Sequence, residues 1–326
     1  MIASASSALT ESAQREAKVL RPTGNREGRV VPLFLAPTTI EPEPSGSNFV
    51  QTQTLSSSSE GAFSDIVVTV DDRPSDQRAI ATATRLALRL GTALHLVSVH
   101  RRNGSGAEYS WRRTLLDDTQ RSLLTRYPDL ARHVDTRVVV DDTTVCPLCE
   151  AYPSAITVTA TDRIPSSSGE MARFAADRLA RQAHRHPIVV VGPRVDDTWR
   201  PGPVAVALNG SPLVGSVLAA AARWATALRV DLELLEVLTS ANSALSDAGS
   251  RQYLRAARRQ VEYDGLRVNC RTVVNDNSGR TIARFLRERD CSLAVMATQR
   301  LHGIERWSVG SLNLIAQSPC PVRVCG

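Results

Sequence analysis

From residue 63 onward, the chain alternates between short runs of aliphatic residues and longer segments whose apolar residues recur at helical spacing. The short runs are typical of strands, and in the first part of the chain they fall at residues 65–70, 93–99, 134–140, 154–160 and 187–191. Apolar residues at every third or fourth position predict helices over residues 74–90, 109–126 and 169–184. Strands that alternate with helices favour a parallel sheet built of right-handed crossovers.

The first of these helices carries its own start and stop signals. Pro74, Ser75 and Asp76 open it, with Ser75 as the predicted N-cap residue. Gly91 is predicted to end the helix, because glycine readily adopts the left-handed conformation that is common just after a helix.

The same order of elements starts again near residue 204. Strands are predicted at residues 204–208, 230–238, 266–274, 293–297 and 322–325. Helices are predicted over residues 212–228, 242–264 and 278–289, with a last one opening at Gly310. Local sequence repeats as well, since VTATDR at residues 158–163 corresponds to VMATQR at residues 295–300. We interpret the chain as two copies of one α/β unit.

The chain divides into three predicted parts. Residues 1–61 are rich in Ser, Thr, Pro and Gly and show little periodicity, which predicts a disordered N-terminal tail. Residues 62–200 are the first predicted domain, and residues 201–326 are the second. The division between the two domains falls in the polar loop at residues 196–202.

Composition and charge narrow the classes of function. The formal net charge is +6, and Lys18 is the only lysine, a bias that suggests a bacterial genome rich in G and C. Acidic residues are interleaved with the arginines and aromatic residues are few, so we expect solvated helix faces and no nucleic-acid partner. The sequence lacks a run of 18 apolar residues and a secretory signal, so we expect no membrane association and a cytoplasmic location.

The last strand-to-helix connection has the form of an anion site. The predicted strand at residues 293–297 leads through a polar loop to a helix start at Gly310 and Ser311, where unpaired backbone N–H groups suit an anion. Ala297 is followed after two residues by Arg300, and Arg300 after nine residues by Gly310. This spacing resembles Gly-x2-Gly-x9-Gly-Ser/Thr, the loop with which the universal stress protein family holds the phosphates of ATP. The first two glycines are replaced here.

The resemblance covers about residues 62–326, so both halves look like universal stress protein domains. It implies an α/β fold of two tandem Rossmann-like domains, of the adenine nucleotide alpha hydrolase-like type. Each would be a five-stranded parallel sheet in the order 3-2-1-4-5, flanked by helices. Family members commonly pair through the fifth strand, and a tandem chain can form that pair internally. A further homodimer and an unknown protein partner are also open.

In that strand order the chain reverses direction between strands one and four, and ligands of open α/β sheets bind at such a point. The resemblance therefore implies cofactor-binding residues at the strand ends of both halves. In the first half these are Asp71, Val99, Ala160 and Arg163. In the second half they are Asn209, Val237, Ala297, Arg300, Gly310 and Ser311. The expected ligand is ATP or another adenine nucleotide with Mg²⁺, and an empty site is the alternative.

The second half is the better candidate for a nucleotide site. Arg300 is bulkier than glycine, but it offers a charged fork suited to phosphate. Asn209 stands for the family's acid, so it keeps the hydrogen bonding and loses the charge that helps to hold a metal ion. In the first half only five residues separate Arg163 from Gly169, and Glu170 replaces the expected serine. A carboxylate at that helix start would repel phosphate.

The six cysteines give no clear metal site. Cys146 and Cys149 form a C-x2-C pair, but no second pair with matching spacing completes a zinc site. A metal site, a redox pair and partly buried thiols remain open for this pair. The other cysteines are predicted to be small core residues, and they are Cys270, Cys291, Cys320 and Cys325.

Three hypotheses about function follow from the sequence. The leading one is a non-enzymatic stress-response module that binds an adenine nucleotide weakly in its second half. The alternative is a ligand-free interaction scaffold that acts through protein partners. No catalytic set of residues stands out at suggestive spacing, so a slow ATPase that depends on Asp71 comes third.

Overall fold

The computed structural model describes residues 63, 65–141, 148, 151–152, 154–161, 187–208, 214–238, 240–262, 265–297, 299–301, 304–306 and 309–325. Within the chain, Ser59–Gly326 forms one compact unit. Several predictions lie outside the described residues, namely those on the tail, the helix at 169–184, Cys146, Cys149, Arg163 and Asn209. The boundaries of the two domains remain predictions, because both halves belong to this one unit.

The described elements follow the predicted alternation of strands and helices. Those of the first half are β1 (Asp65–Thr69), α1 (Pro74–Leu90), β2 (Ala93–Arg101), α2 (Gly106–Arg126), η1 (Pro128–Leu130), β3 (Val134–Asp141), β4 (Ile156–Ala160) and β5 (Ile188–Val191). Those of the second half are β6 (Val204–Leu208), α6 (Val214–Leu228), β7 (Leu232–Leu238), α7 (Ser240–Val261), β8 (Val268–Val274), α8 (Ser278–Glu288), β9 (Leu293–Ala297), β10 (Gln299–Leu301), β11 (Ile304–Arg306), α9 (Val309–Gln317) and β12 (Val322–Cys325).

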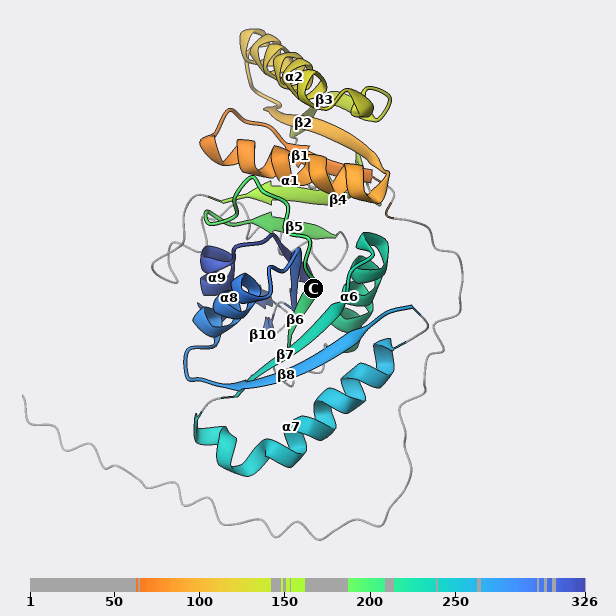
Figure 1. Ribbon diagram of the computed structural model, residues 1–326. Coiled ribbons are helices and arrows are strands. Elements are labelled where there is room, and N and C mark those ends of the chain that lie inside the picture. Colours follow the sequence, from red (N-terminus) through yellow and green to blue (C-terminus); the bar gives the residue numbers. More distant parts are fainter. Residues whose placement is uncertain are drawn as a thin grey trace, which may run out of the picture. The chain divides into compact units, whose positions relative to one another are not determined.

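The described strands form one ten-stranded sheet in the order β3-β2-β1-β4-β5-β12-β9-β6-β7-β8, plus the small hairpin β10-β11. All pairs within each half of the large sheet are parallel. Read from its outer edge inward, each half therefore has the strand order 3-2-1-4-5 (Figure 1). The predicted α/β class and the mostly parallel sheet are confirmed.

The two halves meet through their last strands. β5 and β12 pair antiparallel, with Val322 opposite Val190 and Val324 opposite Ile188. All four residues of each strand are buried. The expected internal pairing through the fifth strands is thus present, and we call this β5–β12 junction the seam.

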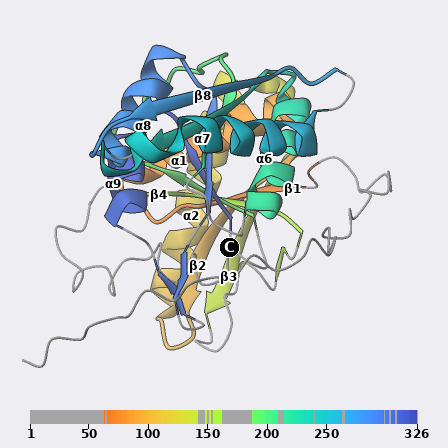
Figure 2. The same cartoon turned by 90° about the horizontal axis from the view of Figure 1, so that it is seen from below.

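Helices cover both faces of the second half. The larger core takes side chains from α1, α6 and α7, including the fully buried Trp224, and lies on one face of the sheet. A smaller core on the other face takes side chains from α8 and α9. Figure 1 shows α6 and α8–α9 on opposite sides of these strands, and Figure 2 places α7 and β8 nearest the viewer. Two-sided cover explains the unbroken apolar run in β9.

The N-cap residue of helix α1 lies two positions earlier than predicted. Arg73, not Ser75, is the N-cap residue, and Ser75 lies buried inside the first turn. The reason is local, because Asp72 turns the chain with a φ of 60° and Pro74 presets a helical φ at the first position. At the other end the prediction is confirmed, since Gly91 caps the helix with a left-handed φ of 65°.

The polar loop that follows β9 contains structure that the sequence did not suggest. β10 and β11 form an antiparallel hairpin in which Gln299 pairs with Arg306 and Leu301 with Ile304. Helix α9 then begins at Val309, one residue before the predicted start. None of the described helices is long and apolar enough to cross a membrane.

Gly192→Ala tests how tightly the seam is packed. Gly192 follows β5, and a Cβ atom there would overlap the backbone carbonyl oxygen of Ile315 in α9. Because the obstacle is backbone, we expect the free energy of unfolding in urea to fall by about 1 to 3 kcal/mol.

Gly249→Ala is the matched control for this change. A Cβ at Gly249, an exposed position of α7, would have no atom within 4 Å. Alanine inside a helix should raise the free energy of unfolding by about 0.5 to 1 kcal/mol. Equal effects of the two substitutions would contradict the close approach at the seam.

Candidate functional site

In each half, the order in which the chain adds strands to the sheet reverses next to the central strand, and the carboxyl ends of the strands at this point form an edge. In the first half β1 lies between β2 and β4, and in the second half β6 lies between β7 and β9. Ligands of open α/β sheets bind at such points. Two edges of the sheet are therefore candidate sites, and we refer to them as the first-half edge and the second-half edge.

The strand register brings three of the predicted residues together at the first-half edge. Thr69 of β1 pairs with Val97 of β2, so Asp71 lies level with Val99. On the other side Val68 pairs with Val158 of β4, which places Ala160 at nearly the same height.

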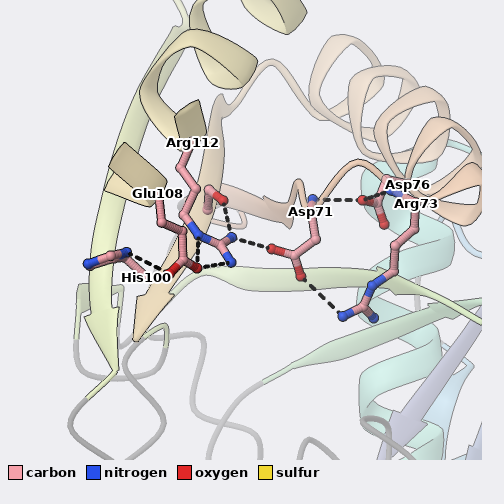
Figure 3. Close-up of polar contacts among 7 residues, drawn as sticks. Asp71, Arg73, Asp76, His100, Glu108 and Arg112 are labelled. Carbon is pink, nitrogen blue, oxygen red and sulfur yellow. Dashed lines mark hydrogen bonds and ion pairs between the residues drawn. The ribbon is translucent and has the colours of Figure 1, made fainter. Parts of the chain in front are cut away.

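An arginine from α2 holds the carboxylate of Asp71. The Nη1 atom of Arg112 donates to Asp71 Oδ1 at 3.0 Å and to the hydroxyl oxygen of Ser98 at 2.9 Å (Figure 3). Its Nε and Nη2 atoms both donate to Glu108 Oε1, at 3.1 and 2.9 Å. The Arg112 side chain is 15% exposed, so these ion pairs are largely shielded from water. Arg73 approaches the other oxygen of Asp71 at 3.6 Å.

The turn after β1 is tied down by Asp76. Its Oδ2 atom accepts the backbone N–H of Asp71 at 2.7 Å and that of Arg73 at 3.0 Å. Burial raises the pKa of the Asp76 carboxyl group above its usual value, although these two N–H groups act to lower it. This turn fixes where the Asp71 carboxylate points.

His100 extends the polar network towards the end of β2. Its Nδ1 atom lies 3.9 Å from Glu108 Oε2, and its ring meets Tyr109 edge to face at 5.6 Å between centroids. Gly104 allows the His100 ring to take this position, because a Cβ atom at residue 104 would overlap the ring. Figure 3 shows His100, Glu108, Arg112 and Asp71 in one chain of contacts.

The first-half edge therefore carries a carboxylate whose charge is already matched. Asp71 faces two guanidinium groups, from Arg112 and Arg73, so it has little charge left to offer a metal ion. Over the part of the chain that the structure describes, no group of three His, Cys, Asp or Glu side chains could hold a metal ion. One signal for Arg112 was present in the sequence and was missed, namely its four-residue spacing from Glu108 on α2.

The second-half edge differs at the matching positions. Ile66 pairs with Leu94 and Val204 with Leu232, so Glu236 of β7 occupies the place of Ser98. The Glu236 side chain is buried and accepts a hydrogen bond from Ser250 of α7. Ser250 lies 3.1 Å from the hydroxyl oxygen of Thr272 in β8. The strand thus carries the acid in the second half, and the helix contributes a hydroxyl group in place of an arginine.

For the predicted site residues of the second half, the strand register and the helix bounds give the positions of the backbone. Val206 pairs with Val295, so Ala297 at the end of β9 lies level with Leu208 at the end of β6. Val237 follows Glu236 in β7, level with the same edge. The backbones of the others lie in the hairpin and in the first turn of α9, and these residues are Arg300, Gly310 and Ser311.

The cysteines follow the sequence prediction in three of four cases. Cys291, Cys320 and Cys325 are buried, as predicted. Burial raises the pKa of the Cys320 thiol to about 12, so this thiol stays protonated at neutral pH. Cys270 is exposed, which corrects its prediction as a core residue. It lies in β8, which is the last strand of the sheet among the described residues, and an inward position there cannot be inferred from sequence alone.

Comparison with protein families matches residues 156–326 to the Universal stress protein family. No curated protein matches the chain. A solved structure from Pseudomonas aeruginosa PAO1, described as functionally unknown, has 15% identity and a TM-score of 0.54, covering 81% of this chain and 92% of that one. A universal stress protein from Archaeoglobus fulgidus DSM 4304 has 14% identity and a TM-score of 0.57, covering 80% and 95%. At these identities the two structures show the fold alone.

A third structure is limited to a smaller part of the chain. It is a universal stress protein from Archaeoglobus fulgidus in complex with dAMP, with 20% identity and a TM-score of 0.33. It covers 38% of this chain and 96% of that one. A similarity at this level carries no argument about what the present chain binds.

Arg112→Met tests the ion pairs at the first-half edge. Removing the guanidinium leaves Asp71 and Glu108 with only their longer contacts to Arg73 and His100, so we expect the free energy of unfolding to fall by about 2 kcal/mol. Arg121→Met on the same helix is the control, because the Arg121–Asp118 pair at 2.7 Å is largely exposed and should contribute less than about 1 kcal/mol. Urea unfolding measures both, and similar losses would contradict the proposed shielding.

Asp76→Asn tests the burial of the capping carboxylate. Both backbone N–H groups donate to the same oxygen, which an amide oxygen can replace. Because folding raises this pKa, the contribution of Asp76 to stability is greatest below its unfolded pKa of about 3.9 and is lost as pH rises through the folded pKa. The variant should therefore gain stability relative to wild type as pH rises from about 4 towards neutrality. Urea unfolding at a series of pH values measures the difference, and a fall with rising pH would contradict the raised pKa.

Proposed function

The chain belongs to the universal stress protein family, and we propose that it is a non-enzymatic stress-response module that binds an adenine nucleotide weakly at its second-half edge. Its proposed location is the cytoplasm. The proposed phosphate contacts are the first turn of α9, with Gly310 and Ser311, and the side chain of Arg300 on the hairpin. The adenosine part would lie near Asn209, Val237 and Ala297.

The observation that carries this proposal is the position of α9. In the order β7-β6-β9, the chain leaves β9, forms the β10–β11 hairpin and enters α9 at Val309. The first backbone N–H groups of a helix have no partner within the helix, and the helix dipole adds partial positive charge there. A phosphate group beyond the ends of β6 and β9 would meet these donors.

The contacts at the first-half edge support a single nucleotide site in the chain, at the second-half edge. Asp71 is the strand-one acid of that half, and Arg112 already occupies one of its oxygens. A nucleotide with Mg²⁺ would have to displace a shielded ion pair there. Such a displacement costs binding energy, so we propose that the first half contributes structure and not a nucleotide pocket.

Weak binding follows from what the second-half edge lacks. Ala297 replaces a glycine, so the backbone loses easy access to positive φ near the phosphates. Asn209 carries no charge, which removes the acid that would help to hold Mg²⁺. We therefore propose that Mg²⁺ strengthens nucleotide binding less at this edge than it would if an acid stood in the place of Asn209.

The paired state of Asp71 also favours a second candidate function. If both edges are closed to nucleotides, the chain is an interaction scaffold that acts through a protein partner. A second copy of the chain is one such partner. Nucleotide binding separates the two candidates directly.

A thermal-shift measurement on the full chain tests the proposed site. ATP, ADP, AMP and cyclic AMP are each added with and without Mg²⁺. A nucleotide at a hundred times its dissociation constant should stabilise the fold by about 2.7 kcal/mol. Gly310→Glu should remove the shift, because a carboxylate in the first turn of α9 repels phosphate and competes for its donors.

Gly106→Glu is the control for the added charge. Gly106 begins α2 in the first half, and a side chain there would have open space. This variant should keep the full nucleotide shift. No shift with any nucleotide in the wild-type chain would favour the scaffold. Release of phosphate from ATP that is lost in Asp71→Ala would instead favour a slow ATPase.

A further inference from the structure

Arg323 is a buried cation at the seam between the two halves. It lies in β12, is 9% exposed and pairs with Val189 of β5. Side chains alternate along a strand, so Arg323 points to the same face as Cys325, which packs in the core shared by α1 and α6. Val322 and Val324 pack in the core on the opposite face.

The guanidinium group has little to balance its charge. Its Nη1 atom donates to the backbone carbonyl oxygen of Ile188 at 3.3 Å and to that of Val324. Among the described residues, the ionisable groups that act on it are Cys325 and Arg223, and neither is a carboxylate. Burial is the main cause that lowers the pKa of Arg323; the Cys325 thiol acts to raise it, and Arg223 acts to lower it by a smaller amount.

This arrangement is costly for the protein without a bound anion. Arginine keeps its proton at any physiological pH, so Arg323 cannot become neutral in the core as a lysine could. Burying an unpaired ion is strongly unfavourable, and backbone carbonyl groups recover only part of the lost hydration. Arg223, on the exposed surface of α6, adds repulsion from a second guanidinium.

Packing alone does not call for an arginine at this position. Arg323 is the second residue of β12, and Val189 is the second residue of β5. The two therefore occupy equivalent places in their halves and face each other across the seam. Valine fills the position in the first half and is fully buried there, so an apolar residue suits this core.

We propose that the seam binds a phosphate-type oxyanion on the face covered by α1 and α6, with Arg323 as the anchoring residue and Arg223 as the second contact. The planar fork of a guanidinium matches two oxygens of a phosphate group, and the low-dielectric surroundings strengthen the pairing. Val189, which faces Arg323 across the seam, adds no charge of its own. This site lies in the strands of the seam and is separate from the second-half edge, so it does not depend on nucleotide binding there.

Inorganic phosphate is the first probe, and the full chain is the protein used. Thermal unfolding is followed in phosphate and in chloride at equal ionic strength and pH. We expect phosphate to raise the midpoint temperature of the wild-type chain above its value in chloride. Equilibrium dialysis with labelled phosphate should give about one bound ion per chain. A phosphomonoester or pyrophosphate that binds at least tenfold more tightly than phosphate would identify the ligand as the phosphoryl group of a larger molecule.

Two variants test the anchoring role. Arg323→Met removes the charge and keeps an unbranched chain, so it should abolish phosphate binding and raise the midpoint temperature in chloride by about 2 °C or more. Arg223→Gln should fold normally, because its position is exposed, and weaken phosphate binding several-fold.

A matched control comes from the other half. Arg85 and Arg223 each precede a large, fully buried residue of their helix, Leu86 in α1 and Trp224 in α6. Arg85 is thus the counterpart of Arg223, but it lines a small pocket together with Trp199 and Pro321. Arg85→Gln should therefore leave phosphate binding unchanged.

Any one of four results would overturn the proposal. One is an equal midpoint temperature in phosphate and chloride. Another is phosphate binding that survives in Arg323→Met, or a lower midpoint temperature of this variant in chloride, which would make the guanidinium a structural partner of the carbonyl groups. The last is loss of the phosphate effect in Gly310→Glu, because that would place the anion at α9. Phosphate binding that persists in Gly310→Glu while nucleotide binding is lost would support both sites independently.

Discussion

The antiparallel pairing of β5 with β12 is the contact on which the rest of this structure depends. It joins two five-stranded parallel arrays into one sheet and buries every residue of both strands. The strand that ends each half would otherwise be an exposed edge with unsatisfied backbone groups. Pairing the two edges satisfies these groups and brings α1 and α6 onto a common core. Gly192 has no side chain because α9 of the second half packs against its backbone.

The two candidate edges share a backbone plan and differ in chemistry. At the first-half edge an arginine from α2 bridges the strand-one acid and Ser98. At the second-half edge a glutamate in the strand takes the place of Ser98 and is satisfied by a hydroxyl group from α7. The first-half edge thus holds an internal ion pair, and the second-half edge holds a glutamate that is hydrogen-bonded to a serine hydroxyl group. Topology alone does not decide which edge can accept a ligand.

The sequence predicted most of the fold because strands such as β9 and β12 are short apolar runs between clear helices. It could not predict the β10–β11 hairpin, whose residues look like an ordinary polar loop. Ser75 was assigned as a cap from residue type, whereas the positive φ of Asp72 moves the helix start. The Asp71–Arg112 pair spans 41 positions, a separation at which residue spacing gives no information. The predicted ligand residues rest on the resemblance to the universal stress protein family, which assigns positions along the chain and not the geometry of side chains.

The difference between Arg323 and Val189 has a consequence for how such a chain can evolve. In a symmetric pair of identical subunits joined by the same ladder, an arginine on the two-fold axis would meet its own copy, and two buried cations would oppose assembly. A symmetric interface must therefore be compatible with its own copy at every position. This condition no longer applies when the two halves are joined in one polypeptide. Each side of the axis can then change alone, and a single charge can be placed where a symmetric dimer would have to accept two or none.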